Sequence, residues 1–225
     1  MMSGFLKCSF VLSLLVYAVV PAKAAGDLNR LILAVEDSWP PFSKRDGSGL
    51  SNQIVQEAYE TQNIKVDFVV APYARQLVAT EKGAYVGAFN VTKEPSTQEK
   101  FHFCEERLFK ATTSYYVNED APLKARTYEE LNSGEKIGVI IGYEYGPFII
   151  ANNKVKKFRV SKQSNLIKML LKKRLDAVLM FDAIAQYTLP QIQNSHKIKR
   201  AFEGQHSDIY VAFSKKHDDA GYFCK

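Results

Sequence analysis

The stretch Leu31–Phe42 most constrains how this chain folds, because a short apolar run breaks abruptly into acidic, aromatic and proline residues. The run at its start is apolar throughout, which is typical of a strand covered on both faces. Pro40 cannot donate a ladder hydrogen bond, so strand pairing has to stop just before it. Glu36, Asp37 and Trp39 therefore follow a buried strand, at the edge where open α/β sheets bind ligands. A plain turn with Trp39 half-buried in the core accounts for the stretch equally well.

The first 24 residues are typical of a signal peptide. Lys7 precedes an apolar run, 10–20, and small residues stand at the two positions that a signal peptidase reads. The run is too short to span a bilayer. We expect cleavage after Ala24 and export of a soluble protein, without lipid attachment because Cys8 lies before the apolar run.

The roughly 200 residues that remain are enough for one large or two small domains. The whole chain has 30 basic and 24 acidic residues, a formal net charge of +6. Lys7 and Lys23 leave with the signal peptide and no acid does, so the charge of the exported protein falls by two, to +4. Lysine clusters at 154–157 and 172–174 are typical of solvated faces, and an exported protein has little reason to meet nucleic acid. We therefore expect no nucleic-acid partner.

Cysteine and histidine patterns give no sign of a metal or a cofactor. After processing only Cys104 and Cys224 remain, in a compartment that permits disulfides. A bridge between them and two separate thiols are both consistent with the sequence. The chain has no CxxC, no HExxH and no histidine pair at helical spacing, so we expect neither a metal site nor a cofactor.

The predicted elements alternate between strands and helices, which indicates an α/β fold. After the first strand, the first set comprises a helix at 50–62, a strand at 64–70, a helix at 72–79 and a strand at 85–91. Short strands at 107–110 and 113–117 follow without a helix between them, which indicates a crossing between two domains. The second set comprises a short helix with a capping box at Thr127 and Glu130, a strand at 136–141, a helix at 161–174 and strands at 175–181 and 207–214.

Glycines flank the end of the strand predicted at 136–141. Gly142 and Gly146 enclose Tyr143, Glu144 and Tyr145, just before a predicted helix. Unpaired N–H groups at a helix entrance attract anions, but many turns need glycine for geometry alone.

Five segments, in order and spacing, resemble the type 2 periplasmic solute-binding proteins of family 3, the group of polar amino-acid receptors of ABC importers. These segments are EDSWPPF at 36–42, YVGAFNVT at 85–92, GVIIGYEYG at 138–146, RLDAV at 174–178 and VAFSKKH at 211–217. The resemblance implies a two-lobed α/β fold of type II, with mixed sheets, helices on both faces and a ligand in the inter-lobe cleft. It places the first lobe at 25–111 with 206–225, and the second at 112–205.

The resemblance also implies ligand-binding positions, with Trp39 stacking on the ligand. Together with Asp37 after the first strand, these positions are Trp39, Phe89, Asn90, Thr92, Tyr143, Glu144 and Tyr145. Each set follows a predicted strand, so the two rims together form a mostly apolar cleft with a few polar groups. In the alternative interpretation, Tyr143 and Tyr145 only pack between a helix and a strand. Glu144 would repel an anionic group and suit a cationic one.

Two positions depart from the amino-acid receptors. Thr97 stands where the family carries an arginine for the ligand carboxylate, and Phe181 where it carries an aspartate for the ammonium. Asp182, one residue later, either serves after a local shift or caps the next helix. We therefore predict a cationic or uncharged, partly flat ligand instead of an ordinary α-amino acid. In the alternative, Arg75 reaches into the cleft and replaces the missing guanidinium, although arginines early in helices more often lie on the surface.

The function that these features predict is binding, not catalysis. We expect a periplasmic monomer that hands a small polar solute to an inner-membrane ABC permease. An exported enzyme that resembles dehydratases of cyclic acids is the alternative, with Glu36, Asp37 or Glu144 as its acid or base. The sequence contains no recognisable pair of nucleophile and base that would support the enzyme alternative. A ligand sensor is a third interpretation, which the sequence does not separate from transport.

The carboxyl end also departs from the resemblance. The family normally continues with one or two helices beyond His217, whereas this sequence stops at Lys225. We expect a truncated end that exposes part of the first-lobe core.

Overall fold

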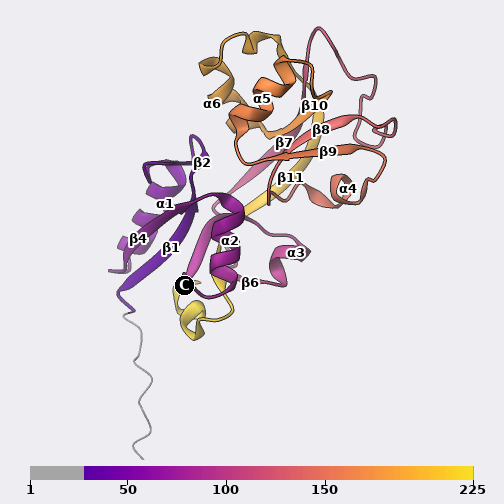
Figure 1. Ribbon diagram of the computed structural model, residues 1–225. Coiled ribbons are helices and arrows are strands. Elements are labelled where there is room, and N and C mark those ends of the chain that lie inside the picture. The colour runs from indigo at the N-terminus through magenta and orange to yellow at the C-terminus, as the bar shows by residue number, and fades with distance from the viewer. Residues whose placement is uncertain (1–27, 225) are drawn as a thin grey trace, which may run out of the picture.

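The computed structural model describes residues 28–224. The predicted signal peptide and its cleavage site lie outside the described residues. Among residues 28–224 no helix is long and apolar enough to cross a membrane. The described chain forms two lobes that are joined by long strands (Figure 1).

The first lobe is built around the buried strand that opens the sequence argument. Strand β1 (Arg30–Glu36) pairs in parallel with β4 (Lys65–Ala71) on one side and β5 (Gly87–Thr92) on the other. Helices α1 (Leu50–Glu60) and α2 (Tyr73–Glu81) make the connections and pack on opposite faces of this sheet. The lobe also contains β2 (Ser38–Trp39), β3 (Ser43–Lys44), α3 (Pro95–Gln98) and β6 (Phe101–Phe103).

The second lobe repeats this arrangement with shorter elements. Strand β8 (Lys136–Ile140) pairs in parallel with β9 (Lys156–Val160) and β10 (Ala177–Phe181). Alternate residues of β10 belong to two separate core clusters. Helices α4 (Gly146–Ala151) and α5 (Gln163–Leu171) therefore pack on opposite faces of this sheet. The rest of the lobe consists of α6 (Asp182–Thr188), η1 (Leu189–Gln191) and η2 (Ser195–Lys197).

Two long antiparallel strands connect the lobes. Strand β7 (Phe109–Asn118) pairs with β10 in the second lobe and with β11 (Ile198–Ser214) along its whole length. Strand β11 continues into the first lobe, where it pairs with β5 and β6. The resulting order is β4-β1-β5-β11-β7-β10-β8-β9, so one curled sheet runs through both lobes.

The predicted elements are confirmed to within a few residues, with three exceptions. The helix predicted at Thr127 is wrong: Glu130 instead accepts a 2.8 Å hydrogen bond from the backbone N–H of Arg126 in an irregular segment. The strands predicted at 107–110 and 113–117 are one strand, β7, and the last strand starts at Ile198 instead of residue 207. Pairing between β7 and β11 extends both strands, and local sequence patterns do not reveal such pairing.

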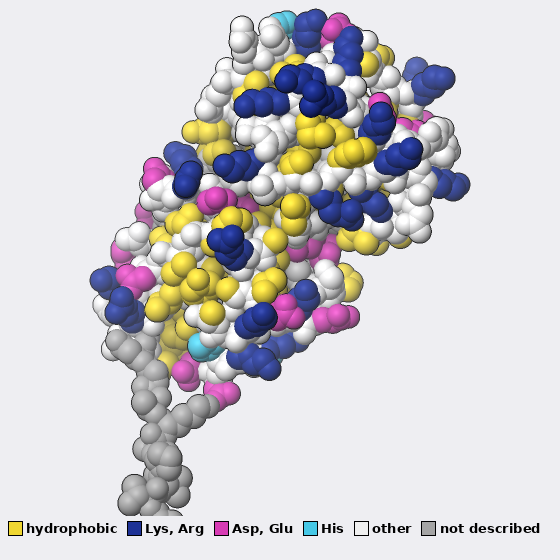
Figure 2. Space-filling model, in the orientation of Figure 1, with side chains coloured by type: hydrophobic (Ala, Val, Ile, Leu, Met, Phe, Trp, Pro, Cys, Tyr) yellow, Lys and Arg dark blue, Asp and Glu magenta, His cyan; other side chains and the backbone are white. Residues whose placement is uncertain are grey.

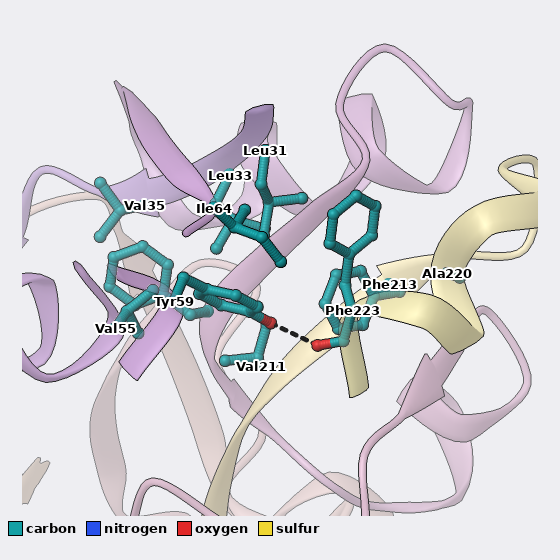
Figure 3. Close-up of a cluster of buried hydrophobic side chains, with 11 residues drawn as sticks. Leu31, Leu33, Val35, Val55, Tyr59, Ile64, Val211, Phe213, Ala220 and Phe223 are labelled. Atoms are coloured by element: carbon teal, nitrogen blue, oxygen red, sulfur yellow. Dashed lines mark hydrogen bonds between the residues drawn. The ribbon is translucent and has the colours of Figure 1, made fainter. Parts of the chain in front are cut away.

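The last described residues close one side of the first-lobe core. The segment η3 (Asp218–Cys224) places Phe223 against Phe213, and the hydroxyl of Tyr59 donates to the carbonyl of Phe223 at 2.7 Å (Figure 3). A disulfide between Cys104 and Cys224 ties this segment to the rest of the lobe. The structure therefore answers the question that the sequence left open about the two cysteines.

Candidate functional site

The first-lobe wall of the cleft consists of strand ends. Glu36 is the last residue of β1, and Trp39 lies in β2 with 2% of its surface exposed. The indole ring stacks on Phe109 at 5.7 Å between ring centroids and meets the edge of Phe181 from the second lobe at 5.2 Å. Trp39 is therefore both a core residue and a contact between the lobes.

Asn90 of β5 points a free acceptor into the same region. Its backbone has φ of 63°, a left-handed conformation that asparagine tolerates better than most residues. Its Nδ2 donates to the hydroxyl of Ser43 at 3.2 Å, whereas its Oδ1 is buried without a hydrogen-bond partner in residues 28–224. The Nε1 of Trp39 is also buried without a partner there. Buried polar atoms are almost always paired, so these two atoms mark a place where a ligand can bind.

The second-lobe wall comes from the loop between β8 and α4. Gly142 has φ of +86°, and a side chain there would place its Cβ 2.8 Å from the Cβ of Ala74 in α2. Glycine thus allows the loop to lie directly against the first lobe. The next two residues, Tyr143 and Glu144, are held at the interface between the lobes.

Two tyrosine–glutamate hydrogen bonds cross the cleft in opposite directions. The hydroxyl of Tyr143 in the second lobe donates to Oε2 of Glu36 at 2.8 Å. The hydroxyl of Tyr73 in the first lobe donates to Oε2 of Glu144 at 2.6 Å. Each lobe therefore supplies one carboxyl and one tyrosine. Both carboxyls are buried, because the exposed fraction is 1% for Glu36 and 7% for Glu144.

Burial favours the neutral form of both carboxyls. It raises the pKa of Glu144 to about 8, although the hydrogen bond from Tyr73 lowers it in part. It also raises the pKa of Glu36 well above its ordinary value, with the Tyr143 hydrogen bond opposing and the nearby charge of Asp37 adding to the shift. A buried carboxylate needs a partner of opposite charge, and burial without such a partner favours the protonated form.

These side chains enclose a small pocket between the lobes. It is lined by Glu36, Trp39, Tyr73, Asn90, Thr92, Tyr143, Glu144, Phe181 and Ile209. Its cavity volume is about 10 Å³, far below the roughly 300–1,000 Å³ of ligand sites, so the lobes have closed on one another. No lysine, arginine or histidine is among these described lining residues, and Figure 2 shows many basic side chains on the outer surface of the second lobe instead.

Six of the predicted site residues lie together in this pocket: Trp39, Asn90, Thr92, Tyr143, Glu144 and Phe181. Asp37 adjoins it and is half-buried. Tyr145 is buried beside Tyr143, and its hydroxyl accepts the backbone N–H of Ile140 at 3.2 Å. Phe89 packs against Phe68 in the first-lobe core.

Three further residues weighed in the sequence analysis lie outside the pocket. Arg75 is exposed on α2. Asp182 is the first residue of α6 and does not cap it; it accepts the Tyr116 hydroxyl at 2.8 Å and lies 3.5 Å from Nη2 of Arg200. Thr97 is buried, and its hydroxyl donates to the carbonyl of Thr92 at 2.7 Å in the capping box of α3.

Sequence reasoning missed Tyr73 and Ile209. It placed Glu36 at the ligand-binding edge of the sheet and as a candidate acid or base, but did not include it among the ligand-binding positions. Tyr73 follows Pro72 directly after β4, so the rule that applied to the other strand ends could have found it. Ile209 lies inside β11, and nothing in its local sequence distinguishes it from a core residue. Among residues 28–224 no cluster of histidine, cysteine and acidic side chains could hold a metal ion.

Neither a protein-family model nor a curated protein matches the sequence. Solved structures do match its fold. The arginine-bound, truncated arginine-binding protein of T. maritima is similar with a TM-score of 0.74 and 18% identity, over 87% of this chain and 93% of that one.

Two other solved structures extend this similarity. A substrate-binding protein of an amino-acid ABC transporter from Streptococcus pneumoniae, bound to L-arginine, has a TM-score of 0.69 and 17% identity, over 87% and 86% of the two chains. An ancestral amino-acid-binding protein, described as a precursor of cyclohexadienyl dehydratase, has a TM-score of 0.69 and 18% identity, over 87% and 85%. The chain therefore has the two-lobed α/β fold of these amino-acid-binding proteins, as its five segments predicted.

Proposed function

We propose that this protein is a family 3 solute-binding protein that encloses a small polar solute between its lobes and hands it to an inner-membrane ABC permease. The observation that carries this proposal is the pair of opposed Tyr–Glu hydrogen bonds across the cleft. Groups from both lobes meet there only when the cleft is closed, as a ligand-gated clamp requires. A signal peptide of 24 residues, a periplasmic location and a monomeric state belong to the same proposal.

The solute binds to the two walls described above. We assign Asp37, Trp39, Asn90 and Thr92 to the first wall and Tyr143, Glu144 and Phe181 to the second. Because the closed pocket is small, the solute enters an open form and the lobes then close around it. The proposal keeps lobe boundaries of 25–111 with 206–225 for the first lobe, and of 112–205 for the second.

The hinge lies where β7 and β11 pass between the lobes, near 104–112 and 205–209. Pairing of β11 with β7 is irregular between Glu203 and His206, and Gly204 lies within that irregular stretch. A strand whose ladder is interrupted bends more easily than one that is continuously paired. The irregular stretch is thus a suitable place for the rotation that separates the lobes.

Small-angle scattering during a screen of small solutes tests the proposal. A melting-temperature screen with amino acids, amines, sugars and nucleobases first identifies solutes that stabilise the protein. The radius of gyration is then compared with and without a saturating solute, and we expect compaction as the solute shifts a mixture of open and closed molecules to the closed form. Absence of stabilisation by the whole screen would contradict solute binding. An unchanged radius of gyration with a bound solute would contradict closure.

An exported enzyme is the second candidate, and one observation favours it. Glu144 is buried in the cleft with a pKa of about 8, so it carries a proton at neutral pH, as a general acid must. No basic side chain lines the described pocket to hold an acidic substrate, which is why we place binding first. Incubation with cyclic hydroxy acids, monitored by ultraviolet absorbance, distinguishes the two. Turnover that Glu144→Gln abolishes would establish the enzyme.

A further inference from the structure

The hydrogen-bonding groups of the cleft are mostly acceptors. Glu36 and Glu144 bring carboxyls from opposite lobes, and Asn90 adds an Oδ1 without a partner in residues 28–224. The matching unpaired donor is the single N–H of Trp39. A ligand that satisfies this set has to be rich in N–H or O–H donors.

The charges of the cleft also favour a cation. Two buried carboxyls face the pocket, with the carboxylate of Asp37 next to Glu36 and that of Glu94 acting on Glu144. Lys100 is the basic group that acts on Glu144, and it lies outside the lining of the pocket. A cationic group between the two carboxyls would stabilise their ionised forms.

A carboxylate on the ligand would find no cation in the pocket. Thr97 stands where the resembled amino-acid receptors carry an arginine. Its hydroxyl donates to the carbonyl of Thr92 and takes part in the capping box of α3. Arg75 is exposed on α2 and does not line the pocket. An anionic group would therefore be buried beside two acids, without a basic side chain among the described lining residues to stabilise it.

Aromatic rings surround the space between the carboxyls. Trp39 and Phe181 meet edge to face at 5.2 Å, and Tyr73 and Tyr143 do so at 4.9 Å. Ring faces attract organic cations when water is excluded, so these walls suit an ammonium or guanidinium group with an apolar or flat body.

We propose that the solute is an organic amine or guanidine without a carboxylate, held with its cationic group between Glu36 and Glu144. This inference rests on the proposed binding function and narrows its substrate class. It separates this cleft from one that holds an α-amino acid by both its ammonium and its carboxylate.

Matched pairs that differ only in the carboxylate test the proposal. Isothermal titration at pH 7.5 compares agmatine with arginine, cadaverine with lysine, and tyramine with tyrosine. We expect at least one amine to bind at least tenfold more tightly than its parent amino acid. Emission of Trp39, the only tryptophan in the chain, gives a second measurement of the same affinity.

Carboxyl-to-amide variants test the assigned contacts. We expect Glu36→Gln and Glu144→Gln each to weaken binding of the preferred amine at least tenfold, whereas Glu57→Gln on the exposed surface of α1 leaves it unchanged. Circular dichroism and melting temperature show whether each variant is folded. Wild-type affinity in both cleft variants would overturn the assignment.

The remaining outcomes separate this inference from the function on which it rests. A parent amino acid that binds as tightly as its amine would overturn the inference and leave solute binding intact. Loss of that amino-acid binding in Arg75→Ala would show that Arg75 enters the cleft. Binding of an uncharged solute alone would also overturn the inference. Absence of binding by every compound in the screen would overturn both proposals.

Discussion

The two walls of the cleft are built from different kinds of structure. On the first-lobe side, Glu36 and Asn90 belong to strands that are hydrogen-bonded to neighbouring strands. On the second-lobe side, Tyr143 and Glu144 lie in a loop whose approach depends on Gly142. The carboxyl of the first wall is therefore held by sheet pairing, whereas Tyr143 and Glu144 of the second wall are held where their loop packs against α2.

The lobes also differ in how their folds are secured. The first lobe contains the disulfide between Cys104 and Cys224, which links residues 120 positions apart. The second lobe, within the described residues, depends on the packing of two core clusters on either side of β10. From this comparison we propose that the first lobe is the platform and the second the closing part of the clamp.

The largest effect is expected from removing the aromatic centre of the first wall. Trp39→Ala should lower the free energy of unfolding by about 3–5 kcal/mol, because a buried ring in contact with Phe42, Phe109 and Phe181 leaves a cavity. Urea denaturation followed by circular dichroism measures this loss, with Trp39→Phe as the milder control. Reduced affinity with unchanged stability would show that the ring is a ligand contact and not a core residue.

Removing the disulfide tests whether the first lobe is the platform. The double variant Cys104→Ser, Cys224→Ser should lose about 2–5 kcal/mol, because the bridge closes a long loop in the unfolded chain. Hydrogen exchange should show the loss around α1 and β1, with β8 and β10 little changed. Equal loss of protection in both lobes would mean that they unfold as one unit, which contradicts the comparison.

The carboxyl of the second wall should make stability depend on pH. Because the pKa of Glu144 is about 8 in the folded protein and about 4.5 ordinarily, its contribution is fully present below 4.5 and is lost as the pH rises through 8. We expect the melting temperature of the ligand-free protein to fall over this range. Tyr73, Glu94 and Lys100 also act on this carboxyl and stay in place in the test.

Glu144→Gln is the variant that isolates this effect. An amide cannot ionise, so the melting temperature of the variant should change less with pH than that of the wild type. Glu36 keeps its raised pKa and should leave a smaller dependence in the variant. Glu57→Gln, on the surface of α1, should follow the wild type. An identical pH profile in Glu144→Gln would refute the assignment.

The smallest effects should come from deleting one hydroxyl at a time. Tyr73→Phe and Tyr143→Phe each remove one hydrogen bond between the lobes and should shift the closing equilibrium by about 0.5–1.5 kcal/mol. Small-angle scattering of the ligand-free proteins should show a larger radius of gyration in both. If only one variant opens, the two bonds are not equivalent, and the bond that this variant lacks controls closure.

The sequence by itself predicted the fold class and part of the first wall. Apolar runs ended by breakers predict β1 and β5, and residues at or just beyond the ends of these strands, such as Trp39 and Thr92, do line the pocket. These features are local, so a single segment reveals them. The same local reasoning failed at Thr127, where a capping-box spacing occurs without a helix, because capping groups also bond to the backbone of irregular segments.

The tertiary structure alone decided which of these residues meet. Glu36 and Tyr143 are separated by 107 positions, and Tyr73 and Glu144 by 71, so no periodicity in the sequence connects them. The same holds for the disulfide, for the exclusion of Arg75 from the pocket and for the pairing that extends β7 and β11. The raised pKa values depend on the closure of the two lobes as well, since a carboxyl loses its water only when both walls surround it.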